Sequence, residues 1–299
     1  MAYSNIILIP STSMEAPLGS IFNNFFVISS ATEALESSDV VWDFSNVASI
    51  HPVLAACLAF YKNATTKLIE SINRNKKIET YLNDICFDKV CHVDSDNISD
   101  IKEGYSAKPF FPICSFDAIN DVIQQDLQHL IIKQCLGKGI TTPLSYMLGE
   151  LICNVYQHAD TKEAYIFFQF DKGEDSIFIC IADKGIGIFS SYVKADKYAD
   201  KIGDSDAEAL KIANEGYSTK NLPNAENRGF GISTSRKMLV NGLGGEFYVM
   251  SGSALQLTVP NSKGTFLELP NNIEWQGTMI ILKMPRVAPE GFVYTDYLE

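Results

Sequence analysis

The sequence predicts an α/β protein of two domains, and three observations support this prediction. Short apolar runs alternate with helical patterns in the amino-terminal part, as they do in a small βα domain. Residues 94–112 are polar and then contain proline, which is typical of an exposed connection. After residue 143, a helix with an apolar stripe is followed by a strand pair and by further strands. We therefore assign residues 1–112 to the first domain with its connection, 113–290 to the second domain, and 291–299 to a tail.

Composition narrows the partners that this chain can have. Its 299 residues leave room for about two domains and an ample core. The formal net charge of -12 argues against non-specific binding to nucleic acid or to an anionic membrane, because both need a cationic surface. The start MAYSNIILIP lacks the basic segment of an export signal, and no stretch approaches the ~18 apolar residues of a membrane span. We expect a cytoplasmic protein that binds neither nucleic acid nor membrane.

The seven cysteines are scattered, and most of them lie in apolar runs, as buried reduced thiols do. Cys86, Cys91 and His92 are close in the sequence, but they lack the second ligand pair that a zinc site requires. We expect reduced thiols and no zinc.

The first domain is predicted to alternate strands with helices, and a proline lies near the first turn of its second helix. We expect a strand at residues 5–10, a helical or mixed stretch from residue 17 and a second strand at 40–44. A helix at 53–61, a third strand at 66–72 and a closing helix at 78–85 follow.

This order, with the turn DFSNVASI and the later segment YLNDICFDKV, resembles a STAS domain, the fold of sulphate transporters and anti-sigma-factor antagonists, over residues 6–93. In that family, the turn after the central strand often carries a serine that a partner kinase phosphorylates. Here His51, Pro52 and Val53 stand where the family usually has Asp-Ser-Ser, and neither Ser45 nor Ser49 falls at the expected place. We expect that the phosphoacceptor is lost and that His51 starts a helix or packs in the core.

The second domain is predicted to begin with two helices. The first contains the apolar residues of 119–131, Gly137 and Gly139 end it, and Pro143 opens the second. After these helices we expect a pair of strands at residues 164–170 and 176–182, a short helix at 207–214 and a polar excursion at 215–228. A further helix is expected at 232–241, and four strands are expected at 247–251, 255–259, 265–269 and 278–284.

The second of these helices carries an acid, an amide and an imidazole at Glu150, Asn154 and His158. A four-residue spacing stacks these groups along one side of an α-helix, beside the apolar stripe that faces the core. Polar groups at such a shoulder predict a functional site, although a solvated polar edge is the alternative for this helix alone.

Asp183 follows an apolar strand and precedes Gly185 and Gly187. A carboxylate in an apolar pocket can accept a hydrogen bond from the exocyclic amine of adenine, and glycines beside it allow the backbone to approach a flat ring. A strand-to-loop turn or part of a calcium loop would show the same pattern. Gly277 and Thr278 precede the last strand, so the hydroxyl of Thr278 could reinforce a contact of Asp183.

Gly229, Phe230 and Gly231 stand at a helix start, where bare backbone N–H groups and the helix dipole suit a phosphate. The Walker pattern is absent from the sequence, which excludes a P-loop. A Rossmann arrangement also fails, because these glycines follow a polar loop and not a strand.

Taken together, the order of ELICNVYQHA, DKGIGI, RGFGIS and GTMIIL resembles the GHKL (HATPase) superfamily of gyrase, heat-shock chaperone ATPases, histidine kinases and MutL, over residues 143–285. The resemblance implies a Bergerat α/β sandwich with a mixed sheet that binds ATP and Mg²⁺. In the family, the residue that matches Asn154 coordinates Mg²⁺, the one that matches Glu150 orients or deprotonates the attacking group, and the one that matches Asp183 holds the adenine amine.

The polar excursion at 215–228 matches the ATP lid of the family, and Gly229 and Gly231 match its phosphate-binding end. Lys220 and Arg228 are candidates to pair with phosphates, against the default of solvated charges. We expect His158 to support the helix end or the lid rather than to catalyse.

Four functions remain open at this point. The first is a regulatory ATPase or switch, in which the ATP state controls a partner protein or the STAS-like domain. The second is a serine/threonine kinase of the anti-sigma-factor type, which acts on a separate STAS or sigma-factor-pathway protein. A histidine kinase would need a phosphoacceptor histidine followed by an acid, which His129 lacks. The fourth is an ATP sensor without catalysis, which the intact Glu150 disfavours; pairing of two copies is possible in each case.

Overall fold

The computed structural model describes residues 5–135, 137, 139–219, 230–270 and 273–298. Two compact units divide the chain: Met1–Cys91 with Pro112–Cys114, and His92–Phe111 with Ser115–Glu299. The predicted α/β class is confirmed, with a βα unit first and a larger unit of sheet and helices second. The domain boundaries expected at 112 and 290 remain predictions.

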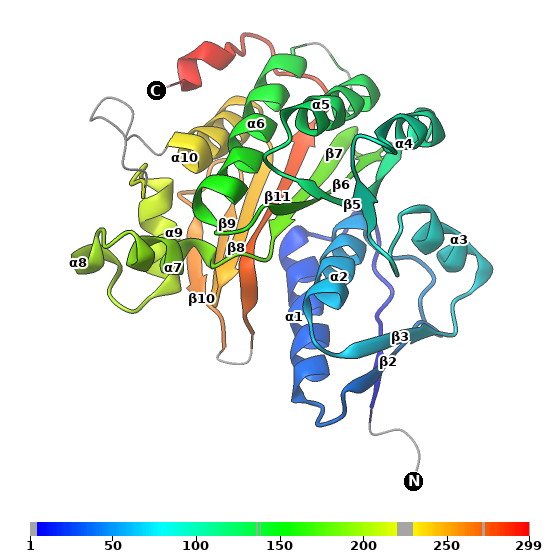
Figure 1. The fold of residues 1–299 in the computed structure, drawn as a ribbon. Coiled ribbons are helices and arrows are strands. Elements are labelled where there is room, and N and C mark those ends of the chain that lie inside the picture. The colour runs from blue at the N-terminus through cyan, green and yellow to red at the C-terminus, as the bar shows by residue number, and fades with distance from the viewer. Residues whose placement is uncertain (1–4, 136, 138, 220–229, 271–272, 299) are drawn as a thin grey trace. The chain divides into compact units, whose positions relative to one another are not determined.

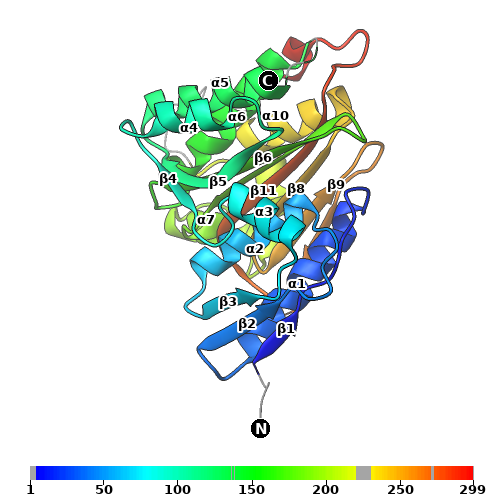
Figure 2. The same ribbon diagram turned by 90° about the vertical axis from the view of Figure 1, so that its right-hand side faces the viewer.

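The first unit is a parallel three-stranded sheet with helices between its strands (Figures 1 and 2). Its strand order is β1-β2-β3. The elements are β1 (Ile6–Leu8), α1 (Leu18–Ala34), β2 (Asp39–Asp43), α2 (Pro52–Ala64), β3 (Leu68–Ile72) and α3 (Lys76–Asp84).

Aromatic side chains hold the core of this unit together. The ring of Trp42 in β2 is stacked on that of Tyr61 in α2, with 6.2 Å between centroids, and its Nε1 donates to Thr32 Oγ1 of α1 at 3.1 Å. His51 is fully buried and caps α2, because its Nδ1 accepts a hydrogen bond from the backbone N–H of Val53 at 3.2 Å. The helix-start role expected for His51 is therefore confirmed.

The larger sheet has eight strands in the order β10-β9-β8-β11-β7-β6-β5-β4. Its strands are β4 (Cys91–Val93), β5 (Phe110–Asp117), β6 (Glu163–Asp171), β7 (Ser176–Asp183), β8 (Glu246–Gly252), β9 (Ala254–Thr258), β10 (Thr265–Glu268) and β11 (Trp275–Pro285). The helices of this unit are α4 (Ile98–Tyr105), α5 (Asp121–Cys135), α6 (Thr141–His158), α7 (Gly187–Lys194), α8 (Ala199–Ile202), α9 (Asp206–Asn214) and α10 (Phe230–Lys237), with a π-helical turn at Met238–Gly242 and a 3₁₀ turn at Tyr294–Tyr297.

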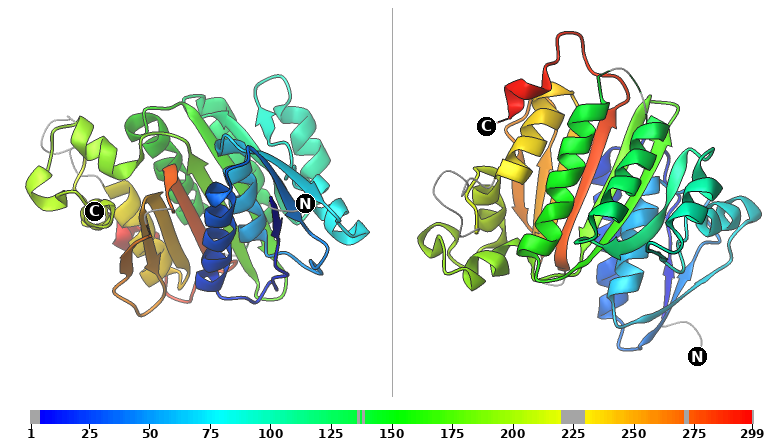
Figure 3. Two further views of the ribbon diagram at one scale, coloured as in Figure 1. Left: turned by 90° about the horizontal axis from the view of Figure 1, so that it is seen from below. Right: turned by 45° about the horizontal axis from the view of Figure 1, so that its top comes forward.

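Helices α5, α6 and α10 lie on one face of this sheet, and α6 contacts both of the others (Figure 3, right). The apolar stripe of α6 that the sequence predicts is buried, and each buried side chain of this kind contributes roughly 1.5–3 kcal/mol. Strand β7 is buried at every position and pairs antiparallel with β6 and β11. The sheet and helix α6 therefore form a rigid scaffold that positions the residues at their ends.

Two expectations for the middle of the chain are wrong. The segment expected to be an exposed connection, 94–112, contains helix α4 and the start of β5, whose first seven residues are all buried. The helix expected to contain the apolar residues of 119–131 starts only at Asp121, so Ile119 lies outside it, in the connection after β5. The run FFPICSF is apolar enough for a buried strand, and its single proline concealed that signal.

Among the helices that the structure describes, none combines the length and the apolar composition that a membrane span requires.

Candidate functional site

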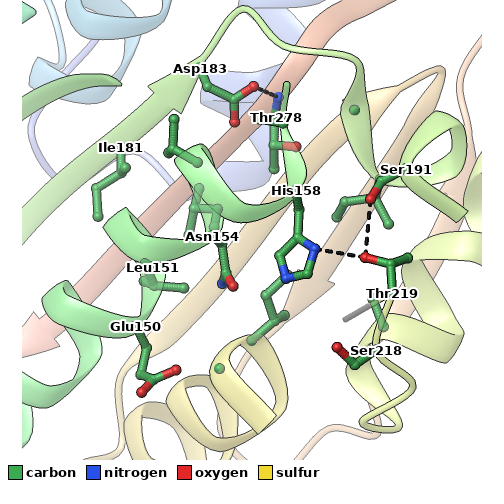
Figure 4. A pocket seen from close by; sticks show the side chains of 18 of the residues that line it. Glu150, Leu151, Asn154, His158, Ile181, Asp183, Ser191, Ser218, Thr219 and Thr278 are labelled. Carbon is green, nitrogen blue, oxygen red and sulfur yellow. Dashed lines mark hydrogen bonds between the residues drawn. The ribbon is translucent and has the colours of Figure 1, made fainter. Parts of the chain in front are cut away.

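A cavity of about 300 Å³ opens in the second unit along helix α6 and at the carboxyl end of strand β7 (Figure 4). Helices α6, α7 and α10, strands β7 and β11 and the segment after α9 all contribute to its lining. The cavity has the size of a small-ligand pocket and combines an apolar part with several polar groups. It brings together residues that are far apart in the sequence.

Glu150, Asn154 and His158 all line this cavity from α6, as their four-residue spacing implies. Figure 4 shows the three side chains one turn apart along the helix. The apolar stripe of α6 turns toward the sheet, so the polar shoulder is left to face the cavity.

Asp183 is the last residue of β7 and is only 4% exposed. Its Oδ1 accepts hydrogen bonds from the backbone N–H groups of Gly185 at 2.8 Å and Thr278 at 3.2 Å. The backbone of Thr278 makes this hydrogen bond, and the reinforcing role expected for its hydroxyl remains a prediction. Both of these hydrogen bonds end on Oδ1, and Asp183 lines the cavity, so its second carboxylate oxygen is available to a ligand as far as the described residues are concerned.

Burial raises the pKa of Asp183 from 3.8 to about 7, while the hydrogen bonds from Gly185 and Thr278 lower it in part. A carboxyl group with such a perturbed pKa in a cavity is a feature of functional sites. The raised pKa of Asp183 means that its carboxylate is a desolvated acceptor in the folded protein. Its negative charge becomes more favourable when a ligand donates a hydrogen bond to it.

This raised pKa makes the stability of the ligand-free protein depend on pH. Because the folded state binds the Asp183 proton more tightly than the unfolded state, the free energy of unfolding should fall as pH rises from about 4 to about 7 and then level off. The full effect of this one group is on the order of 4 kcal/mol. The difference in unfolding free energy between Asp183→Asn and wild type, measured by urea denaturation, should therefore favour the variant more at pH 8 than at pH 5. A difference that does not change with pH would contradict the raised pKa.

The two glycines after Asp183 have different surroundings. A Cβ on Gly185 would lie 2.0 Å from the carbonyl oxygen of Ala159, so this glycine lets the loop pack on the carboxyl end of α6. Gly187 lines the cavity, opens α7 with φ +75, and its Cβ would lie 3.0 Å from Ser251 Oγ. We expected both glycines to admit a flat ring, and of the two it is Gly187 that borders the cavity.

Ser251 connects two elements at the Asp183 end of the cavity, and no sequence pattern predicts this role. Its hydroxyl accepts a hydrogen bond from Ile188 N at 2.9 Å and donates to the carbonyl of Gly277 at 2.9 Å. It thereby joins α7 to β11 beside Asp183. Ser251 lies 63 residues from Ile188 in an ordinary strand, so no local pattern could have identified it.

At the other end of the cavity, Gly231 lies in the first turn of α10, against α6. A Cβ there would be 3.0 Å from Glu150 Oε2 and 3.2 Å from Asn154 Nδ2. The structure thus places Gly231 beside Glu150 and Asn154, a proximity that only the resemblance to the GHKL superfamily implies from the sequence. Phe230 opens the same helix, whereas Lys220, Arg228 and Gly229 lie outside the described residues.

The side chain of Asn154 has hydrogen-bonding capacity to offer a ligand. Its amide Nδ2 is buried, and among the described residues it has no hydrogen-bond partner. The nitrogen of an amide beside a helix start can donate to phosphate oxygens, and its oxygen can bind Mg²⁺. Mg²⁺ typically needs only one or two protein ligands when phosphates and waters supply the others. In the part of the chain that the structure describes, no group of three His, Cys, Asp or Glu side chains could hold a metal ion, so a metal here would depend on such mixed ligands.

Residues 139–286 match the family model of histidine kinase-, DNA gyrase B- and HSP90-like ATPases. This part of the chain is a GHKL ATPase domain. The GHKL domain runs from the start of α6 to the end of β11 and contains every residue of the cavity discussed above. It is an ATP-binding module of the ATPase and kinase type. Among curated proteins, none matches the chain.

Proposed function

We propose that the chain is a regulatory Mg-ATPase, whose ATP state controls a protein partner or its own STAS-like domain. One observation carries the proposal: a single cavity has a buried carboxylate acceptor, Asp183, at one end and a carboxylate beside a helix start, Glu150 beside Gly231, at the other. ATP has a donor-bearing base at one end and a reactive phosphate at the other. The two ends of the cavity therefore suit the two ends of ATP.

The base-binding end recognises adenine by one hydrogen bond between apolar walls. Ile181, Ile188 and Ile280 line this end and offer flat apolar contact to a ring. Asp183 accepts a hydrogen bond from the exocyclic amine, which is a donor in adenine and is replaced by an acceptor in guanine. The hydrogen bonds from Gly185 and Thr278 hold the carboxylate in place for this contact.

At the phosphate end, the first turn of α10 offers backbone N–H groups and the positive end of the helix dipole. Asn154 would hold Mg²⁺, which would supply positive charge to offset that of the phosphates. Glu150 would orient a water molecule and take its proton as the water attacks the γ-phosphorus, while the bond from that phosphorus to ADP breaks and ADP leaves. Glu150 and Asn154 lie one turn apart on α6, and Gly231, which has no side chain, lets the start of α10 lie close to both.

A metal role for Asn154 predicts that nucleotide binding by Asn154→Ala depends on Mg²⁺. With Mg²⁺ present, the variant should bind ATP roughly tenfold or more weakly than wild type, because even the loss of a residue that only supports a metal ligand typically costs 10- to 100-fold in metal affinity. In EDTA, the two proteins should differ little. Titration calorimetry under both conditions measures this, and an equal loss with and without Mg²⁺ would contradict the metal role.

Incubation with ATP labelled at the γ-phosphate, alone and with cell extract, tests the proposed function directly. Release of free labelled phosphate, without labelled protein, is the expected result for a regulatory ATPase. Label on another protein would instead show a serine/threonine kinase of the anti-sigma-factor type that acts on a separate STAS or sigma-factor-pathway protein. Binding without release or transfer would show a sensor, and failure to bind ATP at all would overturn the proposal.

A further inference from the structure

A cluster of two hydroxyls and an imidazole lies between the two ends of the cavity. Thr219 Oγ1 is 2.7 Å from His158 Nδ1 and 3.3 Å from Ser191 Oγ (Figure 4). The three residues come from the end of α6, from α7 and from the segment after α9, and all of them line the cavity. Neither adenine recognition by Asp183 nor catalysis by Glu150 uses this cluster.

The segment that carries Thr219 is held in place from a second side. The Tyr192 hydroxyl donates to the carbonyl of Tyr217 at 2.6 Å, and the Tyr192 ring belongs to a small buried apolar cluster with α9. The position of Thr219 is therefore fixed by the hydrogen bond at Tyr217, two residues before it, and by its own contacts with His158 and Ser191. A cluster held in this way can bind a ligand without a large loss of side-chain freedom.

The place of the cluster along α6 indicates which part of ATP it faces. Ile186 N donates to the carbonyl of Ala159 at 2.8 Å, so the carboxyl end of α6 lies beside the loop that follows Asp183. Each four-residue step along the helix is about 6 Å. From the adenine end, His158 therefore comes first, Asn154 second and Glu150 third. In ATP the ribose lies between the base and the phosphates, which places it at the level of His158.

The chemistry of the cluster fits the hydroxyls of a ribose. A serine or threonine hydroxyl has one donor and two acceptor positions, and a neutral imidazole has one of each. In one arrangement Ser191 donates to Thr219 and Thr219 donates to His158, so Ser191 Oγ can only accept from a ligand. In the other, His158 donates to Thr219 and Thr219 donates to Ser191, so the Ser191 hydroxyl can donate to a ligand. A ribose hydroxyl both donates and accepts, so it can pair with either arrangement.

We propose that Ser191 and Thr219, positioned by His158, form a ribose subsite that selects ribonucleotides over deoxyribonucleotides. This inference rests on the proposed function, because it requires a nucleotide in the cavity. A hydrogen bond between neutral groups contributes roughly 0.5–1.5 kcal/mol, so the lost hydroxyl should weaken binding by about two- to tenfold.

The test compares the binding of ADP, 2′-deoxy-ADP and 3′-deoxy-ADP to the full chain by calorimetry, since ADP cannot be hydrolysed at the γ-position. Wild type should bind ADP about two- to tenfold more tightly than at least one deoxynucleotide. Thr219→Val, which keeps the branched shape but removes the hydroxyl, and Ser191→Ala should bring that ratio close to one. Both variants should lose affinity for ADP but not for the deoxynucleotide, a pattern that general damage to the fold would not produce.

Two matched variants serve as controls. Thr219→Ser restores the hydroxyl and should keep the selectivity, and Ser190→Ala removes an exposed hydroxyl from the same helix and should change nothing. Equal binding of the three nucleotides by wild type would overturn the ribose subsite while leaving the ATP site intact. Unchanged selectivity in both Thr219→Val and Ser191→Ala would overturn it as well. Failure of every nucleotide to bind would overturn the proposed function together with it.

Discussion

Replacing Glu150 by glutamine should lower ATP turnover by about 100- to 10,000-fold while ATP binding changes little. Glutamine keeps the size of the side chain, so the close contact of this position with Gly231 can persist. The amide cannot take a proton from the attacking water, and only that step is lost. Phosphate release measures turnover, and calorimetric titration with ATP measures binding.

Glu208→Gln is the matched control for this prediction. Glu208 is a glutamate on another helix of the same GHKL domain, half-exposed and paired with Lys211 at 3.1 Å, outside the cavity lining. Its replacement should leave both turnover and binding at wild-type values. If Glu150→Gln turned ATP over at the wild-type rate, Glu150 would not be the base. If the variant lost binding as fully as turnover, its role would be in holding the nucleotide.

Helix α6 and strand β7 could be predicted from the sequence because their signals are local. The apolar stripe of α6 repeats at helical spacing, so burial of that stripe fixes where Glu150, Asn154 and His158 point. The buried strand β7 ends at Asp183 for the same kind of reason, since a continuous apolar run is followed at once by glycines. These two elements carry much of the predicted site.

Other parts of the fold depend on contacts that no local pattern records. Helix α7 starts at Gly187 without a side chain that caps it, so no local signal marks its start, and α8 has only four residues. The residue before α8, Tyr198, adopts φ +59, which is uncommon for an aromatic residue and which propensity would not predict. Tertiary packing in the small cluster around Tyr192 favours these helices instead.

The same limit applies within the site. His158 was expected to support the helix end or the lid, and the structure gives it a definite partner, Thr219, which lies 61 residues away. Ser191 and Ser251 also join the cavity through partners that are distant in the sequence. Only the fold brings such pairs together, so sequence spacing could suggest the wall on α6 but not what faces it. The roles assigned to Lys220, Arg228, Gly229 and Phe230 remain predictions.

Asp183→Asn should weaken ATP binding by roughly 10- to 100-fold and should reduce the preference for ATP over GTP. Both hydrogen bonds that position Asp183 end on Oδ1, so an asparagine can keep them with its own Oδ1. Its NH₂ group then takes the place of the second carboxylate oxygen and faces the cavity. A donor there opposes the exocyclic amine of adenine but can pair with the O6 acceptor of guanine.

The ratio of ATP to GTP affinity, measured for wild type and variant by calorimetry, separates recognition from damage. General loss of structure would weaken both nucleotides alike, whereas the exchange of acceptor for donor acts on them in opposite directions. Lys184→Met alters the neighbouring half-buried side chain, which lies over the ring of Tyr165, and should leave the ratio unchanged. If Asp183→Asn kept the wild-type ratio at reduced affinity, Asp183 would hold the loop rather than read the base. If it kept the wild-type affinity as well, adenine would have to be recognised elsewhere in the cavity.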